Sequence, residues 1–179
     1  MSDATAHVRH FRTLARYNAW VNERLYALAQ VLTEEERRRD LRAFFRSVHG
    51  TLNHLLVGDR FLLGRLRAVH HDSVALAGTP VLDDYEPARE LYADLAELAA
   101  ERVVTDRAIL AWTEELTEEV LGRMPGGRPF WSFAAHFFNH QTHHRGQLTT
   151  LFMQLGHDPG VTDIVALPAA RSENNSEGI

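Results

Sequence analysis

Histidines are concentrated in the stretch FFNHQTHHRGQ, which covers residues 137–147. Three of them, His140, His143 and His144, fall within five residues. A helix advances about 100° per residue, so residues four positions apart lie on nearly the same face. One helical face would therefore carry His136, His140, His144 and Gln147. His143 lies about 60° from His140, at the edge of this face.

Two histidines at positions i and i+4 can hold one divalent ion between them when another helix supplies a third ligand. The functional interpretation is a three-histidine site with an open position for water or substrate. The alternative is a histidine-rich polar surface, or a set of hydrogen-bonded core histidines. Apolar neighbours such as Phe133, Phe137 and Leu148 indicate that the face points partly inward. The spacing alone leaves both interpretations open.

Candidates for the third ligand lie in an earlier apolar segment: His49, His54 and Asp59. Asp59 falls in the main apolar stripe of that segment, and His54 lies about 140° away around the helix. Helical geometry does not choose between them. An unpaired buried carboxylate is costly, so we expect Asp59 to meet a hydrogen-bond donor or a cation, and a tie between helices is favoured over metal ligation. Asn18 interrupts the first apolar stripe in the same way, so a tie between helices is favoured for it too. The alternative places Asn18 in a pocket wall.

The amino-acid composition limits which metal ligands the chain can supply and which partners it can bind. The chain has no cysteine, so a transition-metal site must use histidine, carboxylate or water. The formal net charge is −5, and the basic run at residues 37–39 directly follows three glutamates, so we expect no nucleic-acid partner. No apolar run approaches the roughly 18 residues that would span a bilayer, and residues 1–10 lack a signal core. We therefore expect a soluble cytoplasmic protein without a membrane partner.

Helical periodicity dominates the chain, and it predicts an all-α fold. The predicted long helices cover residues 11–32, 41–69, 87–112 and 129–155. Thr33 and Glu36 match a capping box, which places the end of the first helix near Leu32. Pro87 suits the first turn of the third helix, and Gly156 suits the end of the fourth.

The connections support a four-helix bundle. Residues 70–86 are predicted to form a long crossover loop, and Pro-Gly-Gly within residues 118–131 predicts a small hairpin or a loop. Residues 160–168 are predicted to be extended or irregular. Four long helices with one crossover predict a four-helix bundle over residues 1–169, followed by a polar tail at 170–179. No glutamate is followed by a histidine three residues later, which argues against a di-iron carboxylate bundle.

Four segments together resemble the DinB family of metal-binding four-helix-bundle proteins (DinB/YfiT-like proteins). They are YNAWVNERL at residues 17–25, FFRSVHGTLNHLLVGDRFLL at 44–63, HFFNHQTHHRGQL at 136–148 and GVTDIVALP at 160–168. The resemblance implies the bundle fold, often as a homodimer, and one divalent ion, zinc or nickel. It also implies that three histidines hold this ion, and the matching positions are His54, His140 and His144. His136 and His143 then become neighbours of the ligands, and Gln147 could orient a bound water.

The resemblance also suggests an activity. Some relatives are thiol-dependent transferases or isomerases, so we expect a small-molecule substrate and a low-molecular-weight thiol. That thiol must be external, because the chain has no cysteine. A metal ion lowers the pKa of a bound thiol and makes it nucleophilic at neutral pH. The alternatives are hydrolysis by a metal-activated water and a non-catalytic, metal-binding role in a stress response.

Overall fold

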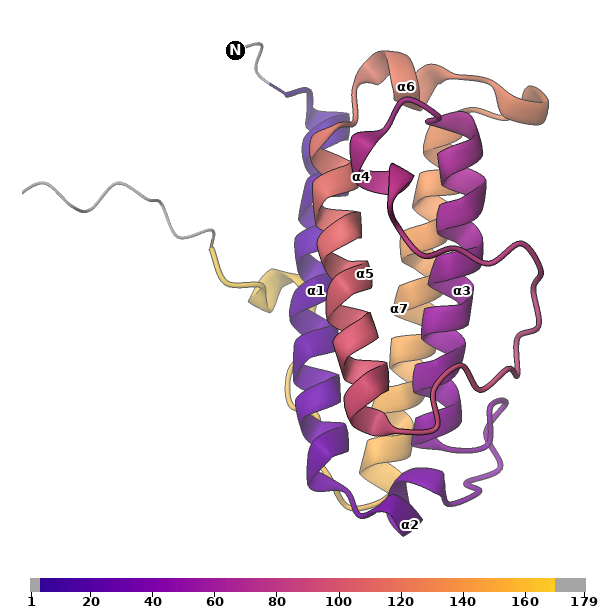
Figure 1. The fold of residues 1–179 in the computed structure, drawn as a ribbon. Coiled ribbons are helices and arrows are strands. Elements are labelled where there is room, and N and C mark those ends of the chain that lie inside the picture. The colour runs from indigo at the N-terminus through magenta and orange to yellow at the C-terminus, as the bar shows by residue number, and fades with distance from the viewer. Residues whose placement is uncertain (1–3, 170–179) are drawn as a thin grey trace, which may run out of the picture.

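The computed structural model describes residues 4–169, and in this range the chain forms helices and no strands. The long helices lie side by side as a bundle (Figure 1): α1 (Ala6–Val31), α3 (Val48–Val69), α5 (Leu95–Glu114) and α7 (Phe130–Gln154). The shorter elements are α2 (Glu34–Arg38), α4 (Val74–Ala77), α6 (Glu118–Gly122), η1 (Pro125–Gly127) and η2 (Ile164–Ala166). The predicted all-α, four-helix bundle is confirmed. The predicted tail at 170–179 falls outside the described residues.

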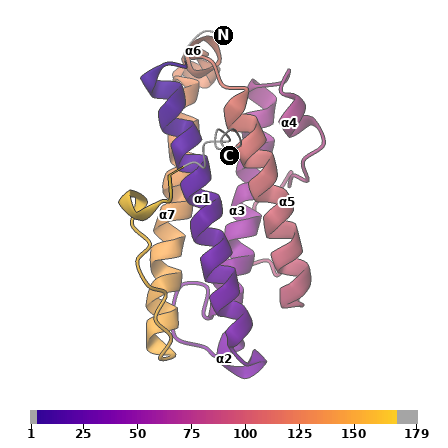
Figure 2. The same cartoon turned by 90° about the vertical axis from the view of Figure 1, so that its left-hand side faces the viewer.

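The direction of each long helix follows from the connections between them. Helices α3 and α5 run parallel, since residues 70–94 cross back along the bundle before α5 begins (Figure 1). Helices α1 and α7 run the opposite way, and a view turned by 90° shows the same arrangement (Figure 2). Helix α1 packs mainly on α5, and α3 packs mainly on α7. The crossover predicted from the sequence therefore places α3 antiparallel to α7.

The first helix ends where the sequence predicts. The Thr5 side chain caps its start by accepting a hydrogen bond from the Val8 amide, and its C-cap residue is Leu32. The predicted capping box is present: the Thr33 side chain accepts from the Glu36 amide, and the Glu36 carboxylate accepts from the Thr33 amide. This box begins the short helix α2.

The predicted start of the second helix at Leu41 is wrong, because α3 begins at Val48. Arg42 and Arg46 adopt positive φ angles of 58° and 67°, which a helix does not permit. Ser47 then caps α3 by accepting a hydrogen bond from the Gly50 amide. The segment before α3 is therefore a tight loop rather than an extra turn of helix.

The predicted start of the third helix at Pro87 is also wrong, because α5 begins at Leu95 with Asp94 as its cap. The segment before it is held against α3. The Asn53 side-chain oxygen accepts hydrogen bonds from the amides of Leu91 and Tyr92 at 2.8 and 3.0 Å. These contacts give the backbone amides of Leu91 and Tyr92 hydrogen-bond partners without a helix. No local sequence pattern predicts them.

Three connections contain short helical turns where other structure was predicted. Residues 118–131 form α6 and η1 rather than a hairpin, and Gly126 and Gly127 supply the positive φ angles of this turn. The crossover at 70–86 includes α4. The segment at 160–168 includes η2 and is attached to α1, since the Tyr17 hydroxyl donates to the Thr162 carbonyl at 2.7 Å.

Two apolar clusters fill the bundle, one toward each end. One surrounds Trp112 and Phe137, and the other surrounds Leu52 and Phe152. Buried polar residues from all four long helices lie between them: Asn18, Asn22, Asp59, Arg102, Asp106, Gln141 and Arg145.

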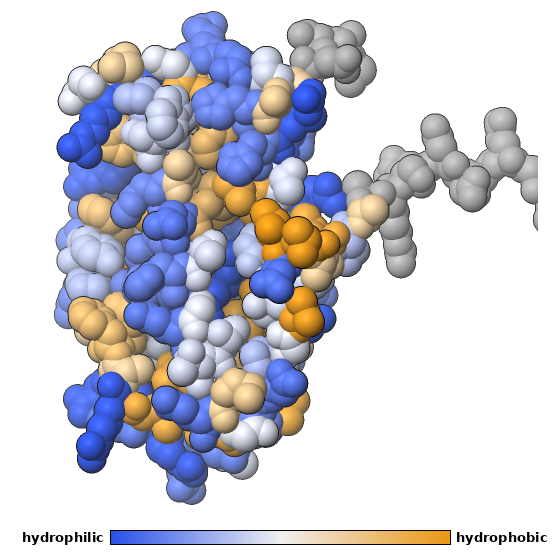
Figure 3. Space-filling view, turned by 180° about the vertical axis from the view of Figure 1, so that it is seen from behind, coloured by the Kyte–Doolittle hydropathy of each residue, from blue (hydrophilic) through white to orange (hydrophobic). Residues whose placement is uncertain are grey.

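The outer surface is mainly hydrophilic when it is seen from behind (Figure 3). Apolar side chains gather on this face beside the grey trace (Figure 3). The described segment at residues 160–168 carries the exposed apolar residues Val161, Ile164 and Val165. No helix within residues 4–169 combines the length and the apolar character needed to cross a bilayer.

Candidate metal centre

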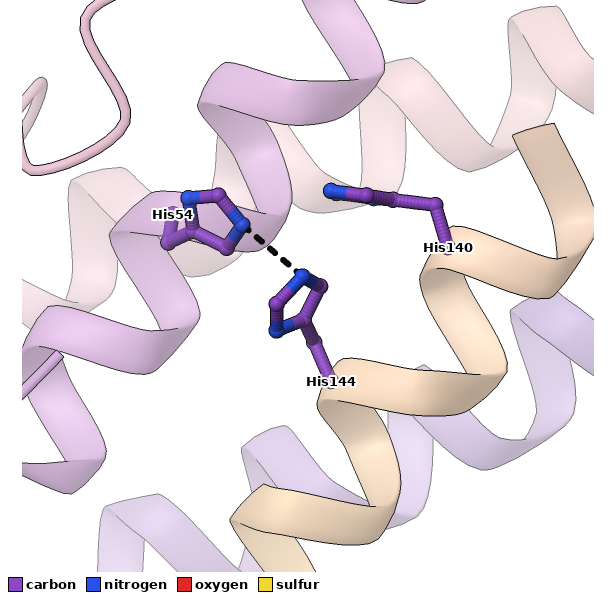
Figure 4. A group of neighbouring side chains, drawn as sticks. All are labelled: His54, His140 and His144. Carbon is purple, nitrogen blue, oxygen red and sulfur yellow. Dashed lines mark hydrogen bonds between the residues drawn. The ribbon is translucent and has the colours of Figure 1, made fainter. Parts of the chain in front are cut away.

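Helices α3 and α7 bring three histidines together. Because the two helices run antiparallel, His54 of α3 faces His140 and His144, which lie one turn apart on α7 (Figure 4). One ring nitrogen from each histidine lies within 4.8 Å of the others. This group could hold a metal ion, and it consists of the three residues that the resemblance implies.

The orientation of His54 is set by a backbone carbonyl from the crossover. Its Nδ1 lies 2.8 Å from the carbonyl oxygen of Pro87, which can only accept, so Nδ1 carries the hydrogen. In the neutral ring, the Nε2 atom then carries a free lone pair. The ring is 1% exposed, and Phe45 stacks on it with 3.6 Å between ring centroids and 14° between planes. These contacts hold the His54 ring with its Nε2 atom directed at α7.

His144 is oriented in the same manner by a side-chain amide. Its Nδ1 lies 2.8 Å from the Gln147 Oε1 atom, and the Gln147 amide nitrogen lies 3.3 Å from His143 Nε2. The amide oxygen accepts from Nδ1–H, so the Nε2 atom of His144 is also a lone pair. The two Nε2 atoms of His54 and His144 face each other at 3.1 Å (Figure 4). Two facing lone pairs repel unless a cation lies between them.

His140 completes the group from the next turn of α7. Its ring is half-buried, and its Nδ1 atom has no hydrogen-bond partner among residues 4–169. The ring lies against the backbone of Gly58, where an added Cβ would be only 2.4 Å from His140 Cε1. A glycine at position 58 therefore makes room for this imidazole between the two helices.

Burial keeps all three imidazoles neutral. Removal from water lowers the pKa of His54 to about 4, with the nearby His144 acting in the same direction and the Pro87 contact against it. Burial and then the neighbouring histidines lower the pKa of His140 to about 3. The pKa of His144 is lowered, again mainly by burial. Metal binding requires neutral imidazole, and these side chains meet that requirement at neutral pH.

The donor set fits a divalent ion of the zinc or nickel type. Imidazole nitrogen suits both metals, and three protein ligands leave a coordination position open. A ring nitrogen of His140 and the facing nitrogens of His54 and His144 would each gain a partner. The rings of His54 and His144 are also each hydrogen-bonded to a carbonyl-type oxygen through Nδ1, as ligating histidines generally are.

The other histidines that the sequence suggests lie outside this group. His49 is buried, but its Nε2 lies 3.0 Å from the Tyr92 carbonyl oxygen, away from the cluster. His143 is exposed and contacts only Gln147 among the hydrogen bonds of the described chain. His136 is exposed and lies beside His140, with 6.3 Å between ring centroids.

Asp59 and Asn18 belong to the polar layer between the two apolar clusters. Asp59 Oδ2 accepts from Arg102 at 2.5 Å, and its other oxygen accepts from Gln141. Asn18 donates to Asp106 at 3.2 Å and accepts from Arg145. Both residues therefore tie helices together, as their polar character in apolar stripes predicts.

Sequence reasoning missed several residues that shape the centre. Phe45 and the Pro87 carbonyl come from loops that were expected to be helical, so no periodic pattern placed them near His54. The i, i+4 spacing of Arg102 and Asp106 on α5 was an available signal for a buried ion pair, which the structure shows at 3.0 Å.

Comparison with known proteins gives a family match and a curated relative. The family model for the DinB family matches residues 1–176. The chain is 25% identical over 158 residues to "Protein DinB" of Bacillus subtilis (strain 168), covering 84% of this chain and 88% of that relative. A comparison with solved structures gives no significant match. On the family match, which spans nearly the whole sequence, the chain belongs to the DinB family.

Proposed function

We propose that the protein binds one divalent metal ion, zinc or nickel, through His54, His140 and His144. The observation that carries this proposal is the pair of facing Nε2 atoms, 3.1 Å apart. Both imidazoles already donate from Nδ1 to a carbonyl-type oxygen, so both Nε2 atoms are acceptors. A cation bound between the two nitrogen atoms accounts for this arrangement. The neutral state of the buried rings favours metal binding.

We further propose that the open position serves a thiol-dependent transferase or isomerase. When bound, the ion acts as a Lewis acid that lowers the pKa of an external low-molecular-weight thiol. In the transfer, the thiol would give its proton to solvent water, its sulfur would form a bond to an electrophilic carbon of the substrate, and the leaving group on that carbon would depart with the bonding electrons. Pro87 and Gln147 hold the histidine rings in place, and Phe45 shields one face of His54 from water. The absence of cysteine in the chain supports an external thiol.

Elemental analysis of the purified protein tests the metal site. We expect close to one zinc or nickel ion per chain, and a loss of at least about tenfold in affinity for His54→Ala, His140→Ala and His144→Ala. His10→Ala is the matched control, because this histidine is exposed on α1 and is not a member of the cluster. Equal metal binding by the control and the three variants would contradict the proposed ligands.

Thiol consumption with a panel of electrophiles tests the reaction. We expect turnover by the metal-loaded protein and none by His54→Ala. Metal binding without thiol turnover would favour the non-catalytic stress-response role, and turnover of esters or amides without thiol would favour hydrolysis.

The homodimer is also proposed from the resemblance. Sedimentation of the purified protein should then give twice the 20.3 kDa mass of one chain.

A further inference from the structure

An apolar groove lies on the α3–α7 seam beyond the histidine cluster. Its cavity is about 350 Å³, within the range of small-molecule sites. Residues of the last turns of α3 and the first turns of α7 form its walls, and η1 closes one end. Its lining includes Leu62, Arg65, Ala68, Phe133 and His136.

The groove lies about one helical turn from the candidate metal centre. On α7, His136 lies one turn before His140, and their ring centroids are 6.3 Å apart. On α3, Leu62 lies one turn after Gly58, whose backbone touches the His140 ring. One helical turn is about 5.4 Å. A ligand that reaches the histidines at one end can therefore extend into the groove within the length of a few bonds.

One lining residue of the groove, Arg65, carries a positive charge. Arg65 is exposed, lies two turns beyond Gly58 on α3, and stacks over Phe61 at 4.9 Å. It forms no ion pair with any residue in the range 4–169. No acidic residue is among the described residues that line the groove. The walls thus suit an apolar group, and the rim suits an anion.

We propose that this groove holds the body of the substrate, which is an aryl or alkyl group that carries an anionic group separate from its reactive end. The reactive end lies at the histidine cluster, the apolar body contacts Leu62 and Phe133, and the anion pairs with Arg65. This assignment of a substrate class rests on the proposed metal site for the reactive end. Binding of the body and the anion does not require the metal.

The first experiment uses the metal-free protein and phenylbutyrate, followed by isothermal titration calorimetry. Ala68→Trp places a large side chain in the groove from an exposed helical position, and Arg65→Gln removes the charge. We expect each variant to weaken binding about tenfold or more. Ala96→Trp and Arg107→Gln, at exposed positions of α5, are the matched controls and should bind as the unmodified protein does. Undetectable binding, or equal binding by all the variants, would overturn the proposal.

The second experiment loads the protein with Co²⁺ and follows its absorption spectrum during titration with thiols. Phenylbutanethiol should bind about tenfold more tightly than 2-mercaptoethanol, and Ala68→Trp should remove this difference without changing the affinity for 2-mercaptoethanol or for Co²⁺. Equal affinities for the two thiols would also overturn the proposal. If no Co²⁺ binds, the metal site fails instead, and the phenylbutyrate titration still decides the groove.

Discussion

At the scale of single residues, hydrogen bonds to the outer ring nitrogens define the candidate centre. His54 and His144 each donate from Nδ1 to an oxygen that can only accept, which fixes the tautomer of both rings. Such contacts orient ligating histidines and raise their basicity as ligands. The sequence places Gln147 on the histidine face, and in the structure its side-chain oxygen accepts a hydrogen bond from His144.

Gln147→Leu tests this orienting contact. Loss of the amide oxygen frees the His144 ring to rotate and to change tautomer, so we expect zinc affinity to fall about 10- to 100-fold. Competition with a chromophoric chelator measures the affinity. Gln154→Leu, an exposed position on the same helix, is the control and should bind zinc normally. Unchanged affinity in Gln147→Leu would show that the contact does not position the ring.

The lowered histidine pKa values predict how the metal-free protein responds to acid. Below pH 6.5 the unfolded chain takes up protons at His54 and His140, whereas the folded protein does not until about pH 4 and about pH 3. The unfolded state therefore binds more protons, and stability falls as the pH is lowered. Asp59 opposes this between about pH 4 and 6, because burial raises its pKa to about 6.

We expect the free energy of unfolding to fall by about 2–4 kcal/mol between pH 6.5 and 4.5, since one pKa unit corresponds to about 1.4 kcal/mol. Urea denaturation with a chelator present measures it. The double variant His54→Gln, His140→Gln should have a much flatter pH profile. An equally steep profile in this variant would assign the acid sensitivity to other groups.

At the scale of secondary structure, the close approach of α3 and α7 creates the site. Gly58 lets the His140 ring lie against the α3 backbone, since an added Cβ would be 2.4 Å from the ring. Phe45, from the loop before α3, stacks on His54. The Pro87 carbonyl, from the crossover, accepts a hydrogen bond from the same ring. Two helices supply the three imidazoles, and two loops set the environment of His54.

Gly58→Ala tests the helix contact. The methyl group must displace either the His140 ring or one of the helices, so we expect a loss of about 1–3 kcal/mol in unfolding free energy together with weaker metal binding. Gly64→Ala is the matched control in the same helix, because its Cβ would be 3.4 Å from Val81. Thermal or urea denaturation and metal titration measure both effects. Similar behaviour of the two variants would contradict the proposed role of Gly58.

At the scale of the whole molecule, a buried polar layer joins the four long helices midway between the two apolar clusters. The carboxylates of Asp59 and Asp106 lie among the guanidinium groups of Arg102 and Arg145, so the charges balance. Burial raises the pKa of Asp106, and the nearby guanidinium groups act against this shift. Buried charges are tolerated only when they are paired and hydrogen-bonded, so this layer favours one alignment of the helices over others.

Asp59→Asn tests the polar layer. The substitution removes one charge of a pair that is almost fully buried, with 0% of the Asp59 side chain exposed, and leaves Arg102 with less compensation. We expect the unfolding free energy to fall by about 3–5 kcal/mol, measured by urea denaturation. Asp84→Asn breaks the more exposed pair with Arg89 and should cost less than about 1 kcal/mol. Equal effects would mean that the buried pair adds little to stability.

The sequence by itself determined the fold class, the approximate extents of α1 and α7, and the helical face of His140 and His144. These properties depend on local periodicity and capping, which neighbouring residues in the chain encode. Family resemblance was needed to choose His54, because the helical wheel of its segment has more than one apolar face.

Only the tertiary structure decided the starts of α3 and α5, the partners of Asp59 and Asn18, and the tautomers of the histidine rings. The backbone of residues 91 and 92 is satisfied by Asn53, which lies 38 and 39 positions earlier. The Pro87 carbonyl reaches His54 across 33 positions. Such contacts form between segments that are distant in sequence, so they depend on how the helices pack and have no local pattern.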